Sequence, residues 1–278
     1  MKQIFDNISA ECSKITTQRY STSFTWGIYM LHKSLRPSIY AIYGFVRFAD
    51  EIVDTFHEYD KKFLLNKFKK DCFEAIAQGI SLNPVLNSFQ NVVNTYNVDH
   101  ELIHLFLNSM EMDLEPAVYS NEKYETYILG SAEVVGLMCL SVFTNGDRNE
   151  YERLKPFAMK LGSTFQKVNF LRDVKADFQQ LNRSYFPEVN LENFSDDQKF
   201  RIEKEIEAEF DEALIGIKQL PSTSKRGVFL AYIYYKTLFN KIKNVTALQI
   251  MDRRIRVSNA HKLVLMLNSM LRYKVNLL

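Results

Sequence analysis

Hydrophobic residues recur every three or four positions along most of the chain, which is the spacing of amphipathic helices. No stretch shows the two-residue alternation of a half-buried strand, and no segment rich in Gly, Pro or Ser divides the chain. The pattern therefore predicts one all-α domain over residues 1–278. The expected helices cover 39–55, 58–78, 84–96, 100–114, 124–143, 150–177, 195–220, 225–243 and 257–273.

Local signals mark where several of these helices begin and end. Asp99 and the Ser195–Gln198 pair are typical N-terminal caps, and Gly79 is a typical helix end. The range 178–194, which contains Pro187, predicts a loop. Each signal supports a chain of helices joined by short connections.

The composition supports a folded helical protein without a nucleic-acid function. Apolar residues make up 46% of the chain and charged residues 24%, enough apolar residues for a substantial core. Only 9 Gly and 6 Pro argue against a β-sandwich or barrel. The net charge is +2, so no broad basic surface for nucleic acid is expected. The acidic run 203–212 is interpreted as a solvated helix face.

The cysteines and the apolar segments indicate in which cellular compartment the protein occurs. Cys12, Cys72 and Cys139 are far apart and odd in number, which favours a reducing compartment over a disulfide framework. The most apolar stretch, 127–143, is short and interrupted by Glu133, so a membrane span is not expected. We predict a cytoplasmic protein and leave peripheral contact with the inner face of the membrane open.

Two helical stretches each carry a pair of aspartates four residues apart among apolar neighbours. The pairs are Asp50 with Asp54 and Asp173 with Asp177. Like charges at this spacing lie on one helix face and repel, and burial increases that repulsion. A bound cation would remove it.

Each pair belongs to a longer polar stripe on its helix. Oxygen-only ligands suit magnesium, which commonly bridges a few carboxylates to substrate phosphates. A single pair of this kind is more often a solvated acidic face, but two pairs in apolar helices favour the metal interpretation. The stripes consist of Tyr43, Arg47, Asp50 and Asp54, and of Gln166, Asn169, Asp173 and Asp177.

These residues lie in segments that resemble the two signatures of the squalene/phytoene synthase family. The similar segments are distributed along nearly the whole chain. They are 21–24, Arg36, 40–54, 110–114, 134–138, 166–177, 182–187, 231–235 and 254–258. The chain departs from the pattern at Asn182, where the family commonly has Gly, and at Tyr20, where some members carry His.

The resemblance implies an isoprenoid-synthase fold, with helices around a central cavity, and magnesium-dependent joining of two allylic prenyl diphosphates. It implies a metal role for Asp50, Asp54, Asn169, Asp173 and Asp177. It implies contacts to substrate for Ser21, Ser23, Phe24, Arg47, Gln166, Asn169, Arg172, Arg183, Tyr185 and Arg254. Tyr43, Arg47 and Tyr235 join the aspartates as expected catalytic residues.

Among members of the family, the chain looks most similar to bacterial phytoene synthases. This similarity implies head-to-head condensation of two geranylgeranyl diphosphates to phytoene through prephytoene diphosphate, in carotenoid synthesis. Mg²⁺, or Mn²⁺ in its place, is the expected cofactor, NADPH is not expected, and other carotenoid-pathway enzymes are candidate partners. Two alternatives remain open: a squalene or dehydrosqualene synthase that uses farnesyl diphosphate, and a non-catalytic relative that binds lipid or assists assembly.

Overall fold

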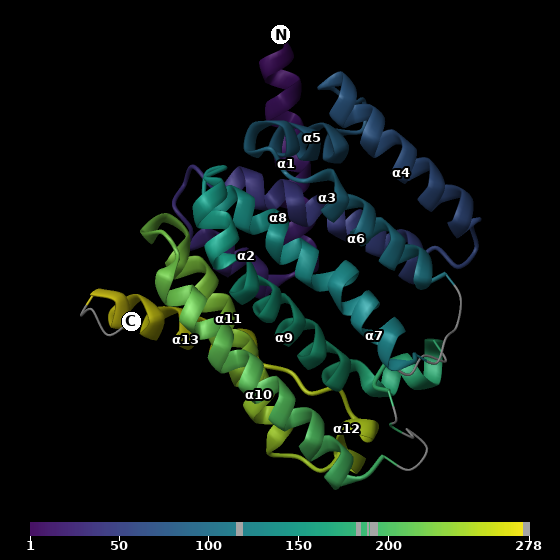
Figure 1. Ribbon diagram of the computed structural model, residues 1–278, viewed down its shortest axis with the longest axis vertical. Coiled ribbons are helices and arrows are strands. Elements are labelled where there is room, and N and C mark those ends of the chain that lie inside the picture. The colour runs from purple at the N-terminus through teal and green to yellow at the C-terminus, as the bar shows by residue number, and fades with distance from the viewer. Residues whose placement is uncertain (115–118, 182–184, 188, 190–193, 275–278) are drawn as a thin grey trace.

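The computed structural model describes residues 1–114, 119–181, 185–187, 189 and 194–274, without the side chains of 176–181 and 270–274. Within these residues the chain is helical and contains no strand (Figure 1). The all-α prediction is therefore confirmed. The helices are α1 (Lys2–Tyr20), α2 (Thr22–Tyr29), α3 (Arg36–Asp54), α4 (Lys61–Gln78), α5 (Pro84–Tyr96), α6 (His100–Met112), α7 (Asn121–Ile128), the π-helix η1 (Leu129–Glu133), α8 (Val134–Phe143), α9 (Arg148–Leu181), α10 (Asp196–Gln219), α11 (Ser222–Lys243), α12 (Ala247–Asp252) and α13 (Asn259–Lys274).

Capping side chains begin the helices where the sequence signals predicted. Asp99 accepts a hydrogen bond from the backbone of Glu101, and Ser195 and Gln198 form a reciprocal capping box. Gly79 ends α4 in the left-handed conformation, at φ 69°. Three helices, α1, α2 and α12, were not predicted. α1 escaped because it buries small polar residues rather than apolar ones.

Two hydrophobic cores hold the helices together. In the first, Phe45 of α3 stacks on Phe89 of α5 with ring centroids 3.9 Å apart and also contacts Phe106 of α6. In the second, Phe210 of α10 contacts Phe239 of α11 with centroids 5.5 Å apart. Figure 1 shows α8 and α9 between the helices of these two cores. The space between the cores is where the site lies.

Glycine allows η1, α8 and α9 to approach closely. A Cβ atom on Gly162 of α9 would lie 2.6 Å from the carbonyl oxygen of Ala132, and one on Gly136 of α8 would lie 3.0 Å from that of Ala158. Because both neighbours are backbone atoms, a side chain here would push the helices apart. The π-helix shifts the register between α7 and α8, a feature that often occurs at functional sites.

The acidic run 203–212 is not a fully solvated face, so that interpretation was wrong. Glu203 and Glu209 are buried on α10. Lys199 forms an ion pair with Glu203, and Lys167 of α9 lies 2.9 Å from Glu209. Buried carboxylates need such partners because desolvation of an unpaired charge is unfavourable.

One helical stretch, Asn121–Phe143, is long and apolar enough by length and composition to cross a membrane. Half of its most apolar window is buried inside the protein. Several residues of α8 that are not fully buried, among them Val135 and Cys139, line the cavity described below. The apolar character of this stretch is therefore explained by the core and the cavity.

Candidate active site

A cavity of about 570 Å³ lies between the two cores. Helices α2, α3, α8, α9, α10 and α11 all contribute side chains to its wall. Charged residues contribute to part of this wall, and apolar and aromatic residues supply most of the remainder. The cavity thus combines the two environments that an amphipathic ligand needs.

α3 contributes the first predicted stripe to the cavity wall. Tyr43, Arg47, Asp50 and Asp54 all line the cavity, so the spacing of four, three and four residues placed them on one face as expected. The guanidinium of Arg47 forms an ion pair with Glu51, one turn further along, and lies 3.9 Å from the carboxylate of Asp50.

The carboxyl group of Asp50 is electrostatically unfavourable in its charged form. Burial raises its pKa to about 8, and the neighbouring charge of Asp54 adds to the rise, while Arg47 opposes it. The charge of Asp113 raises the pKa of Asp50 further. A cation bound here would reverse this balance, because it favours the ionised carboxylates.

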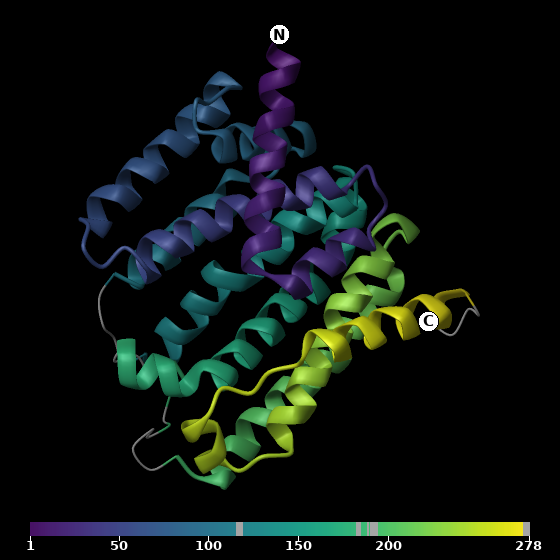
Figure 2. The same cartoon turned by 180° about the vertical axis from the view of Figure 1, so that it is seen from behind.

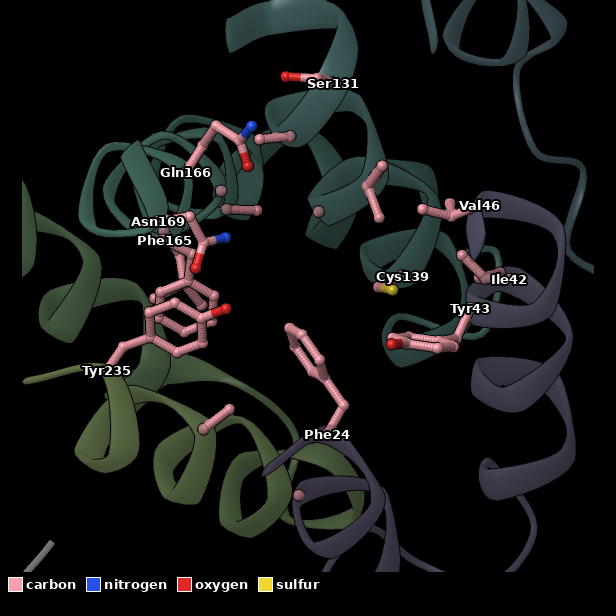
Figure 3. Close-up of a pocket in the computed structure, with 18 of the residues that line it drawn as sticks. Phe24, Ile42, Tyr43, Val46, Ser131, Cys139, Phe165, Gln166, Asn169 and Tyr235 are labelled. Carbon is pink, nitrogen blue, oxygen red and sulfur yellow. The ribbon is translucent and has the colours of Figure 1, made fainter. Parts of the chain in front are cut away.

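α9 contributes the second stripe from the opposite wall. Gln166, Asn169 and Asp173 line the cavity, and Figure 3 shows Gln166 and Asn169 beside the stacked aromatic rings. The guanidinium of Arg172 donates to Asp173 at 3.0 and 2.5 Å. Arg254, from the segment after α12, donates to the same carboxylate, with Nε 2.7 Å from Oδ1.

Aromatic rings surround the middle of the cavity. Phe165 and Tyr235 stack with centroids 3.9 Å apart, and Phe24 lies 5.6 Å from Tyr43 and 6.2 Å from Tyr235. Figure 3 shows Tyr43 on one wall, the Phe165–Tyr235 stack on the other, and Phe24 between them. Aromatic faces carry negative charge density and stabilise cations. Burial raises the pKa of Tyr43 to about 12, so its hydroxyl keeps its proton.

Three further polar residues line the cavity and were not predicted as site residues. The hydroxyl of Tyr127 donates to the carboxylate of Asp113 at 2.7 Å, and both groups are buried. The buried hydroxyl of Ser131, in η1, has no hydrogen-bond partner in the described part of the chain. Asp113 lies in the segment 110–114 that resembles the family, a signal that could have identified it. Tyr127 and Ser131 had no such signal because they lie in the apolar stretch before α8.

The five remaining predicted residues lie in different places. Tyr185 is buried, lines the cavity and stacks on Phe170 with centroids 4.1 Å apart. Ser21 and Ser23, at the start of α2, are not among the lining residues. The Ser21 hydroxyl accepts a hydrogen bond from the backbone of Phe24 and so caps α2. The side chain of Asp177 and the whole of Arg183 lie outside the described residues.

The residues present fit a hard divalent cation held together with a ligand. Apart from Arg47, the stripe side chains that line the cavity carry oxygen atoms, the ligands that magnesium prefers. The Oδ1 atom of Asn169 is buried and has no hydrogen-bond partner among the described residues. Within the described residues, no three His, Cys, Asp or Glu side chains converge on one point. A ligand that bridges the two walls would therefore have to complete the coordination.

Residues 17–261 match the family model described as squalene/phytoene synthase. The chain is 25% identical to phytoene synthase 1 of Solanum lycopersicum, over 95% of the chain and 67% of that protein. It is 25% identical to 15-cis-phytoene synthase of Synechococcus elongatus, over 84% of the chain and 83% of that protein. It is 24% identical to 4,4'-diapophytoene synthase of Staphylococcus haemolyticus, over 63% of the chain and 61% of that protein.

Solved structures show the same fold. A dehydrosqualene synthase superposes with a TM-score of 0.81 at 20% identity, over 98% of this chain and 99% of that one. A squalene synthase from Alicyclobacillus acidocaldarius superposes with a TM-score of 0.75 at 20% identity, over 86% of this chain and 95% of that one. The expected isoprenoid-synthase fold is thereby confirmed.

Proposed function

The chain belongs to the squalene/phytoene synthase family, and on that premise we propose that it condenses two geranylgeranyl diphosphates head to head to phytoene. Members of this family are prenyltransferases that act on prenyl diphosphates. The observation that carries the proposal is one cavity with carboxylates and arginines on facing helices and an apolar, aromatic remainder. A prenyl diphosphate has this same division between a charged head and a long apolar tail.

The charged residues suit the diphosphate. Arg172 and Arg254 approach from α9 and from the segment after α12, and Arg47 approaches from α3. The planar guanidinium of arginine donates pairs of hydrogen bonds to phosphate oxygens. Magnesium held by Asp50, Asp54, Asn169, Asp173 and Asp177 would neutralise charge that develops on the departing diphosphate.

The apolar part suits the carbon chains and the carbocations. Phe24, Phe165 and Tyr235 line the cavity, and aliphatic side chains continue the wall. Such a lining excludes water, which would otherwise capture an allylic cation. The first step would join the two chains to prephytoene diphosphate with loss of one diphosphate and one proton. The second step would lose the other diphosphate and a second proton, and therefore needs no reductant such as NADPH.

The similarity to phytoene synthases over most of the chain supports the geranylgeranyl substrate. The similarity to a 4,4'-diapophytoene synthase and to the fold of a dehydrosqualene synthase supports a second candidate, condensation of two farnesyl diphosphates. The presence of Asp50, Asp54, Asp173 and the arginines in one cavity disfavours a non-catalytic relative, which would have no reason to retain them.

The test is incubation of the purified chain and Mg²⁺ with geranylgeranyl or farnesyl diphosphate, with and without NADPH, followed by analysis of the hydrocarbon products. The proposal expects a C40 product from geranylgeranyl diphosphate, formed equally well without NADPH. Consumption of farnesyl diphosphate alone would establish the second candidate. No diphosphate release from either substrate would refute both.

A further inference from the structure

The cavity extends from a charged, partly exposed end to an apolar, buried end. At the charged end the side chains of Asp50 and Arg254 are 34% and 49% exposed. At the other end Leu31, Leu154 and Leu220 line the wall, and each is buried. A prenyl group whose diphosphate binds at the charged end therefore points toward the buried end.

The link between α2 and α3 closes the buried end of the cavity. The backbone of His32 donates to the carbonyl oxygen of Thr223, in the first turn of α11, at 2.8 Å. The guanidinium of Arg36 donates to the carbonyl oxygen of Leu31 at 3.0 Å. Figure 2 shows this link, in purple, beside the start of α11. These hydrogen bonds hold Leu31 across the end of the cavity.

Phe157 of α9 lines the cavity near this end and is supported from behind by α10. A Cβ atom on Gly216 of α10 would lie against the Cβ of Phe157 and 2.7 Å from its Cγ. The base of the Phe157 side chain therefore rests on the backbone of α10, a contact that is possible only because Gly216 has no side chain. Since packed interiors yield little, Phe157 cannot withdraw toward α10 when a ligand presses on it.

The position of Phe157 along α9 matches the length of a geranylgeranyl group. At 1.5 Å per residue, the 16 helical steps from Phe157 to Asp173 span about 24 Å. An extended chain advances about 1.2 Å per bond, as in an extended polypeptide, so a geranylgeranyl group spans roughly 18 Å and a group with one more isoprene unit roughly 23 Å. The diphosphate and its cation fill the remaining length. The C20 group therefore ends near Phe157, and a C25 group would overrun it.

We propose that Phe157 sets the longest prenyl group that the cavity accepts, and that Gly216 makes this limit rigid by supporting the side chain from behind. The inference rests on the proposed function, because it places the diphosphate among the aspartates. Exclusion of a longer group by a clash is a common source of specificity. A farnesyl group would end before it reaches the ring, so Phe157 restricts longer groups and does not select against shorter ones.

The test is calorimetric binding, with Mg²⁺, of farnesyl, geranylgeranyl and geranylfarnesyl thiolodiphosphates, in which sulfur replaces the oxygen that leaves with the diphosphate. The unsubstituted chain should bind the C25 analogue at least about tenfold more weakly than the C20 analogue, because the longer group must displace a fixed ring. Phe157→Ala should bind the two within about threefold of each other, because removal of the ring opens space for the extra unit. The milder change Phe157→Leu should give an intermediate ratio. Circular dichroism verifies that each variant is folded.

The matched control is Phe73→Ala. Phe73 of α4 is likewise a half-buried ring packed against the first core, but it is not among the lining residues of the cavity. This variant should keep the preference of the unsubstituted chain for the C20 analogue.

Three results would overturn the proposal: equal binding of the C20 and C25 analogues by the unsubstituted chain, an unchanged ratio in Phe157→Ala, or the same change of ratio in Phe73→Ala. None of them would contradict the proposed reaction, which is measured by its hydrocarbon product. Conversely, binding in the expected ratios without any hydrocarbon product would refute the reaction and leave the role of Phe157 established.

Discussion

Arg254 and Asp173 form an ion pair across the wall of the cavity, with Nε 2.7 Å from Oδ1. Arg172 donates to the same carboxylate. The predicted metal ligand is thus held by two side chains that are themselves predicted to hold the diphosphate. A cation at Asp173 competes with the guanidinium groups, and its binding would free them for the anionic substrate.

The substitution Arg254→Gln should have opposite effects on the two ligands. Loss of a charge-assisted hydrogen bond should weaken binding of inorganic diphosphate by about tenfold. Binding of Mn²⁺ alone should become tighter, by about threefold, because one competitor for Asp173 is removed. Calorimetry with diphosphate and electron paramagnetic resonance with Mn²⁺ measure the two effects separately. Arg253→Gln, one residue earlier and outside the cavity wall, is the control, and a parallel loss of both ligands would contradict the competition.

Substitution of one aspartate in either pair should abolish turnover without unfolding the protein. Asp50→Asn and Asp173→Asn each keep the shape of the side chain but lose a metal-binding charge, so a loss of at least about a hundredfold in rate is expected. Diphosphate release measures turnover, and circular dichroism measures folding. Asp71→Asn, on the exposed surface of α4, should leave the rate unchanged. Full activity in Asp50→Asn would remove the metal role assigned to α3.

Asp50 should also make stability depend on pH in the metal-free protein. Its folded pKa of about 8 lies above the ordinary value of 3.8, so the folded state binds the proton more tightly than the unfolded state. Protonation of Asp50 therefore stabilises the folded state. This contribution to the free energy of unfolding is fully present below about pH 4 and is lost as the pH rises to about 8. About a third of the side chain is exposed, at 34%, so solvent screening reduces the effect to about 1–2 kcal/mol.

Asp50→Asn should therefore be more stable than the unsubstituted protein at pH 8, and the difference should vanish near pH 4. Thermal unfolding in the presence of a chelator at both pH values measures this. Glu74→Gln, an exposed change on α4, should show no such dependence. An Asp50→Asn variant that is less stable at pH 8 would show that the carboxylate has a favourable partner there.

The buried hydrogen bond between Tyr127 and Asp113 should contribute to stability. Tyr127→Phe removes the hydroxyl that donates to Asp113, so a buried carboxylate oxygen loses this hydrogen bond. The loss should lower the free energy of unfolding by about 1–3 kcal/mol. Urea denaturation measures the change. Tyr59→Phe, on an exposed ring at 69%, should change the free energy by less than about 0.5 kcal/mol. Equal effects of the two substitutions would show that the buried bond is energetically neutral.

The ion pair between Lys167 and Glu209 should behave as a buried pair. Lys167→Met leaves Glu209 without its nearest buried cation and should cost about 3 kcal/mol of stability. The double variant Lys167→Met, Glu209→Leu should be more stable than that single variant, because neither charge then remains unpaired. Denaturation of both variants measures the difference. A double variant that is less stable than Lys167→Met would show that Glu209 is held by Lys160 and Ser163 instead.

Helical periodicity by itself determined the fold class, most helix positions and the two aspartate stripes. These features can be predicted from the sequence because residues three or four positions apart always lie on the same face of a helix. The aspartate spacing placed Asp50 and Asp54 on one face before any packing was known.

Only the tertiary structure decided which stripes face each other and which charges are buried. Glu209 looked solvated in the sequence, but packing of α10 against α9 brings Lys167 to it. The position of Arg254 beside Asp173 joins residues far apart in the chain. The burial of Ser9, Ser13 and Thr17 on α1 was likewise set by the surfaces that the other helices offer it. Local sequence carries no information on contacts of this kind, because their partners come from distant segments.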